Sequence, residues 1–182
     1  MENHKILILF ALIVLSTIQM VSAIDITNCT TINESGTYAL KNDMTANGTC
    51  LVITADNVSI DGSGFTIIGD ISVSGGDNGG ITYRAFTGLN ISNVNVIGAV
   101  KAEGGTGLAP YPYGGTWEYN HNGGTISVIN SNITSIITHG GKSNVGGMGG
   151  DVMVTNSIIS TIDASGDEGG YCCGDPGGSG GT

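Results

Sequence analysis

The chain of 182 residues carries 15 acidic and 5 basic residues, which gives a formal net charge of −10, and it contains 32 glycines. A surface with so few cations offers little to phosphate groups, so nucleic acid is excluded as an expected partner. Aromatic residues make up only 5% of the chain, which leaves few large side chains for an ordinary globular core. A solenoid does not need them, because small and β-branched residues stack between its coils.

Residues 1–23 have the organisation of a secretion signal. Lys5 lies in a short polar start, an apolar run extends from Ile6 to Leu15, and the small-residue ending Val21-Ser22-Ala23 is typical of signal-peptidase sites. The run is too short for a bilayer, which takes about 20 residues. We therefore expect an exported chain without a transmembrane segment, secreted or held at the cell surface; an uncleaved anchor is the alternative.

Residues 24–50 are expected to form an N-terminal leader that caps the solenoid. Cys29 and Cys50 lie in it, and export makes them candidates for a disulfide bond with each other. Cys172 and Cys173 are adjacent, and a bond between neighbours forces a strained ring. These two are expected to stay free or to pair elsewhere, and the sequence leaves their role open.

The repeated part of the chain is expected at residues 51–166. The segments 123–141 and 149–166 align on Asn130 and Asn156, and further copies align on Asn93 and, more weakly, on Asn57. Alternation of apolar and polar residues predicts short strands in each copy, and recurrence with loops of variable length predicts a solenoid. The side chains expected to point inward and form one apolar column are Ile53, Ile60, Leu89, Ile91, Val96, Ile126, Val128, Ile133, Ile136, Val152, Val154, Ile159 and Ile162.

Asparagine at a fixed corner of each copy predicts a structural ladder. Asparagine tolerates the left-handed backbone conformation, and its side-chain amide can hydrogen-bond to the asparagines of neighbouring coils.

Two insertions interrupt the copies, at residues 75–83 and 104–124. The second concentrates aromatic residues in a chain that has few. Flat rings stack on sugar faces, so this insertion is a candidate binding site for polysaccharide or another cell-surface component. The alternative is that the rings pack on the side of the solenoid. The candidate ligand-binding residues are Tyr111, Tyr113, Trp117, Tyr119 and His121.

No catalytic set is expected. The basic residues after the signal are Lys41, Arg84, Lys101 and Lys142, and no carboxylate cluster accompanies Arg84. Asp61 with Asp70, or Asp163 with Asp167 and Glu168, could supply the paired carboxylates of a glycosidase, but acidic residues in glycine-rich turns are more often turn formers. His121 and His139 have no marked partner. We expect no cofactor.

No metal site is expected either. Residues 146–154 fit the nine-residue calcium-binding pattern that includes Asp151. That pattern requires Met153 to point inward, whereas the repeat alignment requires Val152 and Val154 to do so, and a strand cannot satisfy both.

Six glycosylation sequons occur, at Asn28, Asn33, Asn47, Asn57, Asn90 and Asn132. The candidates for modification are Asn90, Asn33 and Asn47. Asn90 is preferred to Asn57 because it points outward between the inward Leu89 and Ile91.

Residues 167–182 read as a glycine-rich loop or the start of a further coil. They contain no apolar periodic stretch that could close a solenoid, and the ending resembles the Gly-Gly entry to the earlier strands. We expect the chain to be a fragment of a longer array; a complete protein with a disordered tail is the alternative.

The segment 51–69, with Asn-Val-Ser-Ile-Asp-Gly-Ser-Gly followed by Thr-Ile-Ile-Gly, resembles the opening coil of right-handed parallel β-helix proteins of the pectate-lyase-like superfamily. The upstream Cys29, Gly36-Thr37-Tyr38, Asn42-Asp43 and Gly48-Thr49-Cys50 resemble the leader of archaeal and bacterial β-helix surface proteins. The later Gly-Gly-strand-Asn-Ser units resemble repeats of adhesin-like surface proteins.

This resemblance implies an all-β, right-handed parallel β-helix with glycine-rich insertions. It also implies an exported surface or adhesin-like structural and recognition protein without catalysis. The alternative on the same fold is a polysaccharide lyase, a glycosidase or a carbohydrate-binding module.

Overall fold

The computed structural model describes residues 22–74, 88–104, 123–140 and 148–166, and these residues form strands and turns without any helix. The strands are β1 (Ile24–Ile26), β2 (Thr30–Ile32), β3 (Gly36–Leu40), β4 (Met44–Ile53), β5 (Val58–Asp61), β6 (Thr66–Ser74), β7 (Leu89–Ser92), β8 (Asn95–Glu103), β9 (Ile126–Ile129), β10 (Asn132–Ile137), β11 (Val152–Thr155) and β12 (Ile158–Asp163). The predicted all-β class is confirmed.

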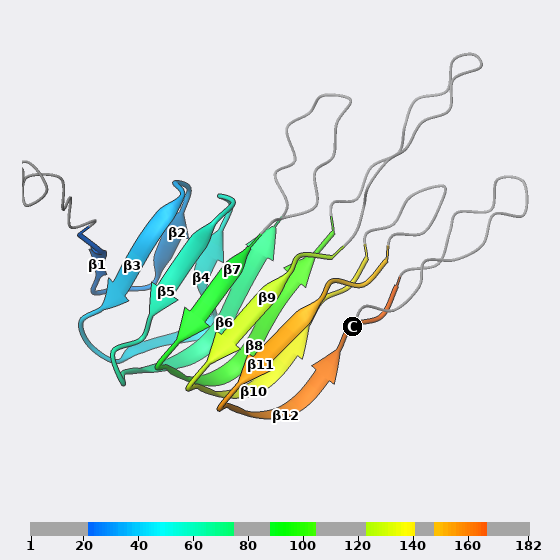
Figure 1. Ribbon diagram of the computed structural model, residues 1–182. Helices are drawn as coiled ribbons and strands as arrows, with labels where there is room; N and C mark the ends of the chain where they lie inside the picture. Colours follow the sequence, from blue (N-terminus) through cyan, green and yellow to red (C-terminus); the bar gives the residue numbers. More distant parts are fainter. Residues whose placement is uncertain (1–21, 75–87, 105–122, 141–147, 167–182) are drawn as a thin grey trace, which may run out of the picture.

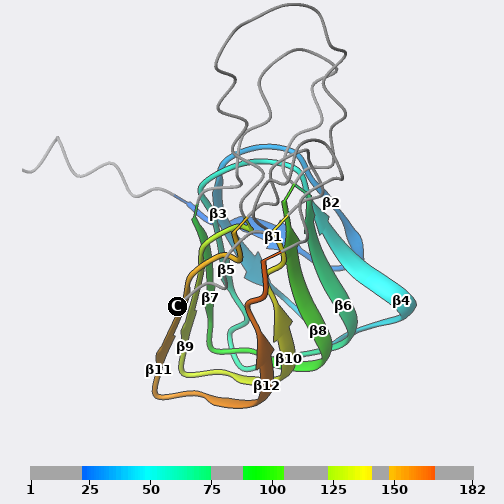
Figure 2. The ribbon, with the colours of Figure 1, turned by 90° about the vertical axis from the view of Figure 1, so that its right-hand side faces the viewer.

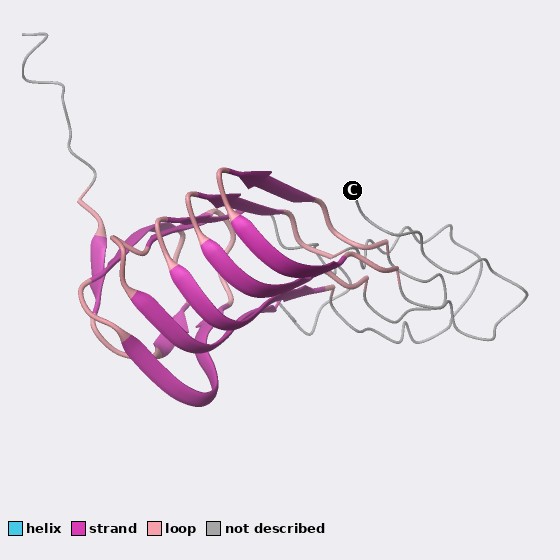
Figure 3. Ribbon diagram, turned by 90° about the horizontal axis from the view of Figure 1, so that it is seen from below, coloured by secondary structure: helices cyan, strands magenta, loops and turns pink. Residues whose placement is uncertain are grey.

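The strands belong to two parallel sheets of six strands each. Sheet A has the order β1-β3-β5-β7-β9-β11, and sheet B has the order β2-β4-β6-β8-β10-β12. The chain therefore passes alternately between the sheets, and each passage adds one strand to each. We call a sheet A strand with the sheet B strand that follows it a coil. Figure 1 shows the coils side by side, Figure 2 looks along the stack, and Figure 3 shows it from below.

The strand register between coils places aliphatic residues beside aliphatic residues of the next coil. In sheet A, Ile60 pairs with Ile91, Ile91 with Val128, and Val128 with Val154. In sheet B, Val96 pairs with Ile133. Because side chains alternate between the two faces of a strand, each pairing stacks one inward side chain on the next and forms a continuous column.

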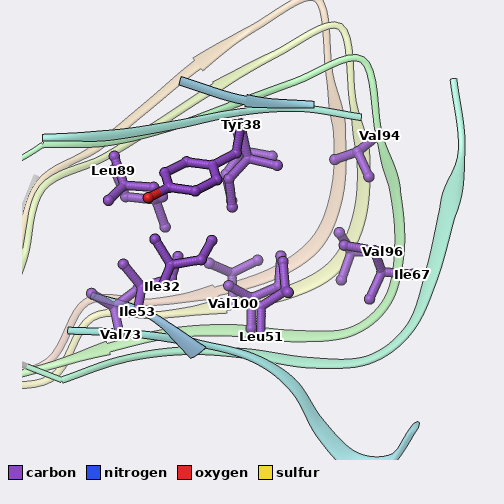
Figure 4. Packing of buried hydrophobic residues seen from close by; sticks show 14 of the residues in the cluster. Ile32, Tyr38, Leu51, Ile53, Ile67, Val73, Leu89, Val94, Val96 and Val100 are labelled. Carbon is purple, nitrogen blue, oxygen red and sulfur yellow. The ribbon is translucent and has the colours of Figure 1, made fainter. Parts of the chain in front are cut away.

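These columns form the hydrophobic core between the two sheets (Figure 4). It consists almost entirely of aliphatic side chains, with Tyr38 as an aromatic member near the N-terminal end of the stack. Nine of the thirteen residues predicted to point inward are at most 1% exposed, namely Ile53, Ile60, Leu89, Ile91, Val96, Ile126, Val128, Ile133 and Ile136.

The four predicted members in the last described coil keep the register but are less covered. Val152 and Ile159 pack partly against the core, whereas Val154 is 42% and Ile162 is 51% exposed. The predicted inward register is therefore kept in this coil, but its side chains are less buried than those of the inner coils. The physical reason is that β11 and β12 each have a neighbouring strand on one side only.

Asparagines occupy the corner between the sheets in the last three coils. Asn93, Asn130 and Asn156 have φ angles of 52°, 49° and 48°, the left-handed conformation that was predicted. The Asn130 amide Nδ2 donates to Asn93 Oδ1 at 3.5 Å, and Asn93 Nδ2 donates to Asp61 Oδ1 at 3.1 Å. The ladder therefore continues onto an aspartate in the third coil.

The placement of Asn57 in this ladder was wrong. Asn57 also has a positive φ, of 53°, but it precedes β5 and lies beside Gly88 at the opposite corner. The position that corresponds to Asn93 is Gly62, whose amide bonds to Ser92 O. The corner of the third coil consists of the four residues 62–65, whereas the same corner of the fourth coil consists of the two residues 93–94. An alignment of the coils on their asparagines therefore pairs the wrong residues here.

The disulfide bond joins the first two coils. Cys29 and Cys50 are bonded, with their Cα atoms 4.5 Å apart, immediately before the paired residues Thr30 and Leu51. The predicted pairing is confirmed. The predicted boundary between leader and coils, at residues 50 and 51, falls within β4, and β1 to β4 belong to the same two sheets as the later strands.

Candidate functional site

Long connections occur at only one corner of the coils that the structure describes. The turns from sheet A to sheet B in the last three coils consist of residues 93–94, 130–131 and 156–157. By contrast, the segments 75–87, 105–122 and 141–147 each follow a sheet B strand in the chain and precede the next sheet A strand. Because the coils are stacked, these segments are anchored side by side. We call this corner the insertion corner.

The predicted ligand-binding residues Tyr111, Tyr113, Trp117, Tyr119 and His121 lie outside the described residues. Their segment is attached at Gly104 and Gly123, in the middle of the insertion corner. Sequence reasoning recognised two insertions but could not show that they share one corner, because that depends on the coil register.

Glycines at the base of the insertion corner allow close approach of neighbouring backbones. Gly123 N donates to Met148 O at 2.8 Å, and Gly104 N donates to His139 O at 2.9 Å. A Cβ on Gly150 would collide with the Gly124 carbonyl oxygen, and one on Gly123 would lie 2.6 Å from Gly150 N. The repeated Gly-Gly pairs therefore hold successive insertions at the spacing of the coils.

Thr138 reinforces this base from the buried side. Its amide donates to Asp163 O at 2.8 Å, and its hydroxyl donates to Gly150 O at 3.0 Å. The Thr138 side chain is fully buried, so these bonds satisfy polar groups that water cannot reach. A threonine in an otherwise apolar column was the only sequence signal for this contact.

His139 and Asp163 form an ion-pair contact between the last two coils at the same corner. His139 Nε2 lies 3.1 Å from Asp163 Oδ2, and both side chains are exposed. His139 is thus a surface histidine, and the sequence did not mark Asp163 as its partner. The residues are 24 positions apart, and only the stacking of coils brings them together. Hydrogen bonds with His139 and with Ser165 lower the pKa of Asp163.

The carboxylates considered for catalysis have structural partners. Asp61 Oδ1 accepts from Ser63 N at 2.9 Å and from Asn93 Nδ2, which fixes the corner turn. Asp70 accepts from Lys101 Nζ at 2.6 Å and from Ala99 N at 2.9 Å. Asp61 belongs to sheet A and Asp70 to sheet B. Arg84, Asp167, Glu168 and His121 lie outside the described residues.

The strand register decides the direction of Met153. Val152 pairs with Ile126 and Met153 with Ser127, and Met153 is 58% exposed. The register inferred from the repeats is confirmed, and the inward direction that the calcium-binding pattern requires of Met153 does not occur. In the described ranges, no three His, Cys, Asp or Glu side chains gather as metal ligands would.

The candidate glycosylation residues Asn33, Asn47 and Asn90 are all exposed. Asn57 is exposed as well, so accessibility does not separate it from Asn90. Asn47 lies on a bulge in β4, between Thr45 and Thr49, where the pairing with β6 shifts. Asn90 lies within β7, between Ser59 and Ser127 of the neighbouring strands.

A cavity of about 450 Å³ opens at the N-terminal end of the stack. Apolar side chains of Ile26, Ile32 and Tyr38 line it, and Thr27, Asn28 and Glu34 contribute polar atoms. It lies in the first coil, at the end of the stack opposite β11 and β12 (Figure 1). No pattern in the sequence indicated this cavity.

The fold and the insertion corner define a protein of two parallel sheets that carries its variable segments along one side. Comparison of the sequence with family models found no match, and neither the curated proteins nor the solved structures contain a significant match. Within the described ranges no helix is long and apolar enough to cross a membrane.

Proposed function

We propose that this chain is an exported recognition protein of the cell surface, in which a right-handed parallel β-helix presents the insertion corner to a glycan or another surface component. In this proposal the protein has no catalytic activity. The observation that carries it is the attachment of the segments 75–87, 105–122 and 141–147 at one corner of successive coils. A rigid scaffold that positions variable loops along one side is a common arrangement for binding.

The two parallel sheets support assignment to the β-helix folds of the pectate-lyase-like superfamily. Each connection from one sheet A strand to the next passes through sheet B. Parallel crossover connections are right-handed in about 98% of cases, which favours the right-handed form.

Export is supported by the disulfide bond between Cys29 and Cys50. Disulfide bonds persist in oxidising compartments and are rare in the cytosol. The bond also fits the secretion signal expected in residues 1–23, of which residues 1–21 lie outside the described ranges.

A binding role without catalysis is supported by the partners of the acidic residues. Asp61 and Asp70 accept hydrogen bonds that hold a corner and a strand bend, and Asp163 contacts His139. A carboxylate that transfers a proton or attacks a sugar must be available to the substrate, whereas Asp61 and Asp70 are engaged by structural hydrogen bonds.

A glycan-array screen with the intact chain and the Trp117→Ala variant tests the proposal. We expect the intact chain to bind a subset of saccharides and the variant to lose that binding, because the substitution removes the indole ring on which a sugar would stack. Tyr83→Ala is the matched control: it removes an aromatic ring from the neighbouring segment 75–87 and should leave the same binding in place if the segment 105–122 makes the contact.

Incubation of the intact chain with soluble polysaccharides tests the absence of catalysis. Shortening of a polymer, measured as new reducing ends or unsaturated products, would contradict the proposal and favour the lyase or glycosidase alternative. Equal binding by the intact chain and Trp117→Ala would contradict the assignment to the segment 105–122.

A further inference from the structure

Asn47 is the only asparagine in the described ranges that is followed by glycine. In an asparagine–glycine pair the main-chain nitrogen of the glycine can attack the side-chain amide of the asparagine. The attack closes a succinimide ring and releases ammonia. Glycine favours this reaction because it carries no side chain that obstructs the approach and because its backbone rotates freely.

The structure places this pair outside the hydrogen-bonded ladder of sheet B. Thr45 of β4 pairs with Ile68 of β6, and pairing resumes with Thr49 opposite Asp70. Residues 46–48 lie between these two pairs and have no paired residue in either neighbouring strand, β2 or β6. A bulge of this kind leaves its residues free of the ladder, so the ladder does not oppose the rotation that ring closure requires.

The bulge also gives water and a new ring the space they need. Asn47 and Gly48 are both exposed. A Cβ atom added to Gly48 would meet no other atom within 4 Å. Water can therefore reach a succinimide formed at this position and open it.

The pair Asp61-Gly62 shows how the fold blocks the same chemistry elsewhere. An aspartate before glycine can also form a succinimide, by loss of water. Here, however, the Gly62 amide donates to Ser92 O at 2.7 Å, and Gly62 is buried. Asp61 Oδ1 accepts from Ser63 N at 2.9 Å and is held in the corner turn. Attack would break these bonds, so this pair is protected in the folded chain.

The ladder asparagine Asn130 is protected in a similar way. Its neighbour Ser131 is small, but the Ser131 amide donates to Ser157 Oγ at 3.0 Å. Ser131 is also only 6% exposed. The nitrogen that would attack the Asn130 side chain is therefore engaged by the next coil.

We propose that Asn47 is a site of spontaneous modification, at which the folded chain loses ammonia and acquires a carboxylate. Gly48 N bonds to Asn47 Cγ, the bond from Cγ to Nδ2 breaks, and the proton of the Gly48 amide leaves with Nδ2 as ammonia. Water then opens the ring at one of its two carbonyl carbons. Opening at Cγ gives aspartate, and opening at the main-chain carbonyl gives isoaspartate. No oxidant, reductant or enzyme takes part.

The modification changes the charge and the glycosylation potential of this bulge. It adds one negative charge to the net charge of −10. It removes Nδ2, the atom to which the sequon Asn47-Gly48-Thr49 would attach a glycan. Isoaspartate also adds one carbon to the main chain, but it does so outside the ladder, so the modified chain stays folded.

Peptide mapping of the intact, folded chain without a glycan on Asn47 tests the proposal. The chain is incubated at mildly alkaline pH in water labelled with heavy oxygen. We expect the peptide that contains Asn47 to gain the mass of an exchange of NH for one heavy oxygen, with isoaspartate among the products. The conversion should be at least an order of magnitude faster than any change at Asn130 or Asp61. Asn47→Gln is the matched variant and should abolish it, because the longer side chain would have to close a larger ring.

A second incubation, in denaturant and with the disulfide bond reduced, separates sequence from structure. Unfolding should accelerate the change at Asp61 and at Asn130 by at least an order of magnitude and should alter the rate at Asn47 much less. Three results would overturn the proposal. The first is an Asn47 that is stable in the folded chain but converts in the unfolded one. The second is an equal rate at Asn47 and Asn130 in the folded chain. The third is a mass gain at Asn47 without heavy oxygen, which would place the reaction in the handling of the peptides.

Discussion

The Asp70 carboxylate in β6 lies 2.6 Å from the Lys101 ammonium in β8, and the amide of Ala99 donates to the same carboxylate. The pair joins the third and fourth coils at a strand bend where Gly69 and Gly98 are in close contact. These side chains are only partly exposed, so the interaction is less screened than a typical surface ion pair.

We predict that Lys101→Met lowers the free energy of unfolding by about 1 kcal/mol, because it removes a charge-assisted hydrogen bond from a carboxylate that keeps its bond to Ala99. Chemical denaturation measures the change. Lys41→Met is the matched control, since Lys41 pairs with Asp25 at a more exposed site, and its effect should be smaller. An equal or larger effect at Lys41 would contradict the role given to Asp70.

The same pair predicts a pH dependence. Lys101 and the Ala99 amide lower the pKa of Asp70 in the folded state. Near and below about pH 4, the ordinary pKa of aspartate, Asp70 therefore binds more protons in the unfolded chain than in the folded chain. The stability that Asp70 contributes is fully present above that pH and is lost as the pH falls through the lowered folded-state pKa. Thermal melts between pH 2 and 5 should show a shallower decline for Asp70→Asn than for the unsubstituted chain.

Substitution of adjacent residues in β9 tests the direction of the strand. Val128 is fully buried, whereas Ser127 lies on the outward face between Asn90 and Met153. Val128→Asp should cost several kcal/mol because a charge would be buried without a partner. Ser127→Asp should change the free energy of unfolding by less than about 0.5 kcal/mol. Similar melting temperatures for both variants would contradict the register.

Removal of the disulfide bond should destabilise the N-terminal coils. The bond closes a loop between residues 21 positions apart, and the chain-entropy estimate for such a loop is about 3 kcal/mol. The double variant Cys29→Ser/Cys50→Ser should show this loss in denaturant unfolding, and reduction of the unsubstituted chain should reproduce it. Mass mapping of the non-reduced protein is the direct measurement, and a link from Cys29 to Cys172 would contradict the pairing.

Substitutions at Asn130 separate backbone conformation from side-chain bonding. Its φ of 49° is accessible to glycine at no steric cost but strains alanine. We expect Asn130→Ala to lower the free energy of unfolding by about 1 kcal/mol and Asn130→Gly to have a smaller effect. If the two variants are equally destabilised, the hydrogen bond to Asn93 matters more than the backbone angle.

The repeated segments around Asn130 and Asn156 could be interpreted correctly from the sequence because both copies keep the same number of residues from strand to corner. Val128 and Val154, and Ile133 and Ile159, pair as the alignment predicted. The alignment failed at Asn57, which lies at the opposite corner of the third coil; the corner that corresponds to Asn93 consists there of the four residues 62–65, whereas the last three coils have two. An alignment that only counts residues along the chain cannot detect this longer corner. Strand pairing and core packing determine the register of the strands on either side of it.

The sequence by itself determined the all-β class and the direction of the side chains in most strands, since both follow from the local alternation of apolar and polar residues. Apart from the Cys29–Cys50 pair and the pairs of the aligned repeats, only the tertiary structure decided which distant residues meet. The contact of His139 with Asp163, the continuation of the asparagine ladder onto Asp61 and the shared corner of the insertions all depend on how coils of unequal length stack. The physical reason is that hydrogen bonds between neighbouring strands determine how the coils stack. Residues added in the connections change the number of positions between paired residues without changing the pairing itself.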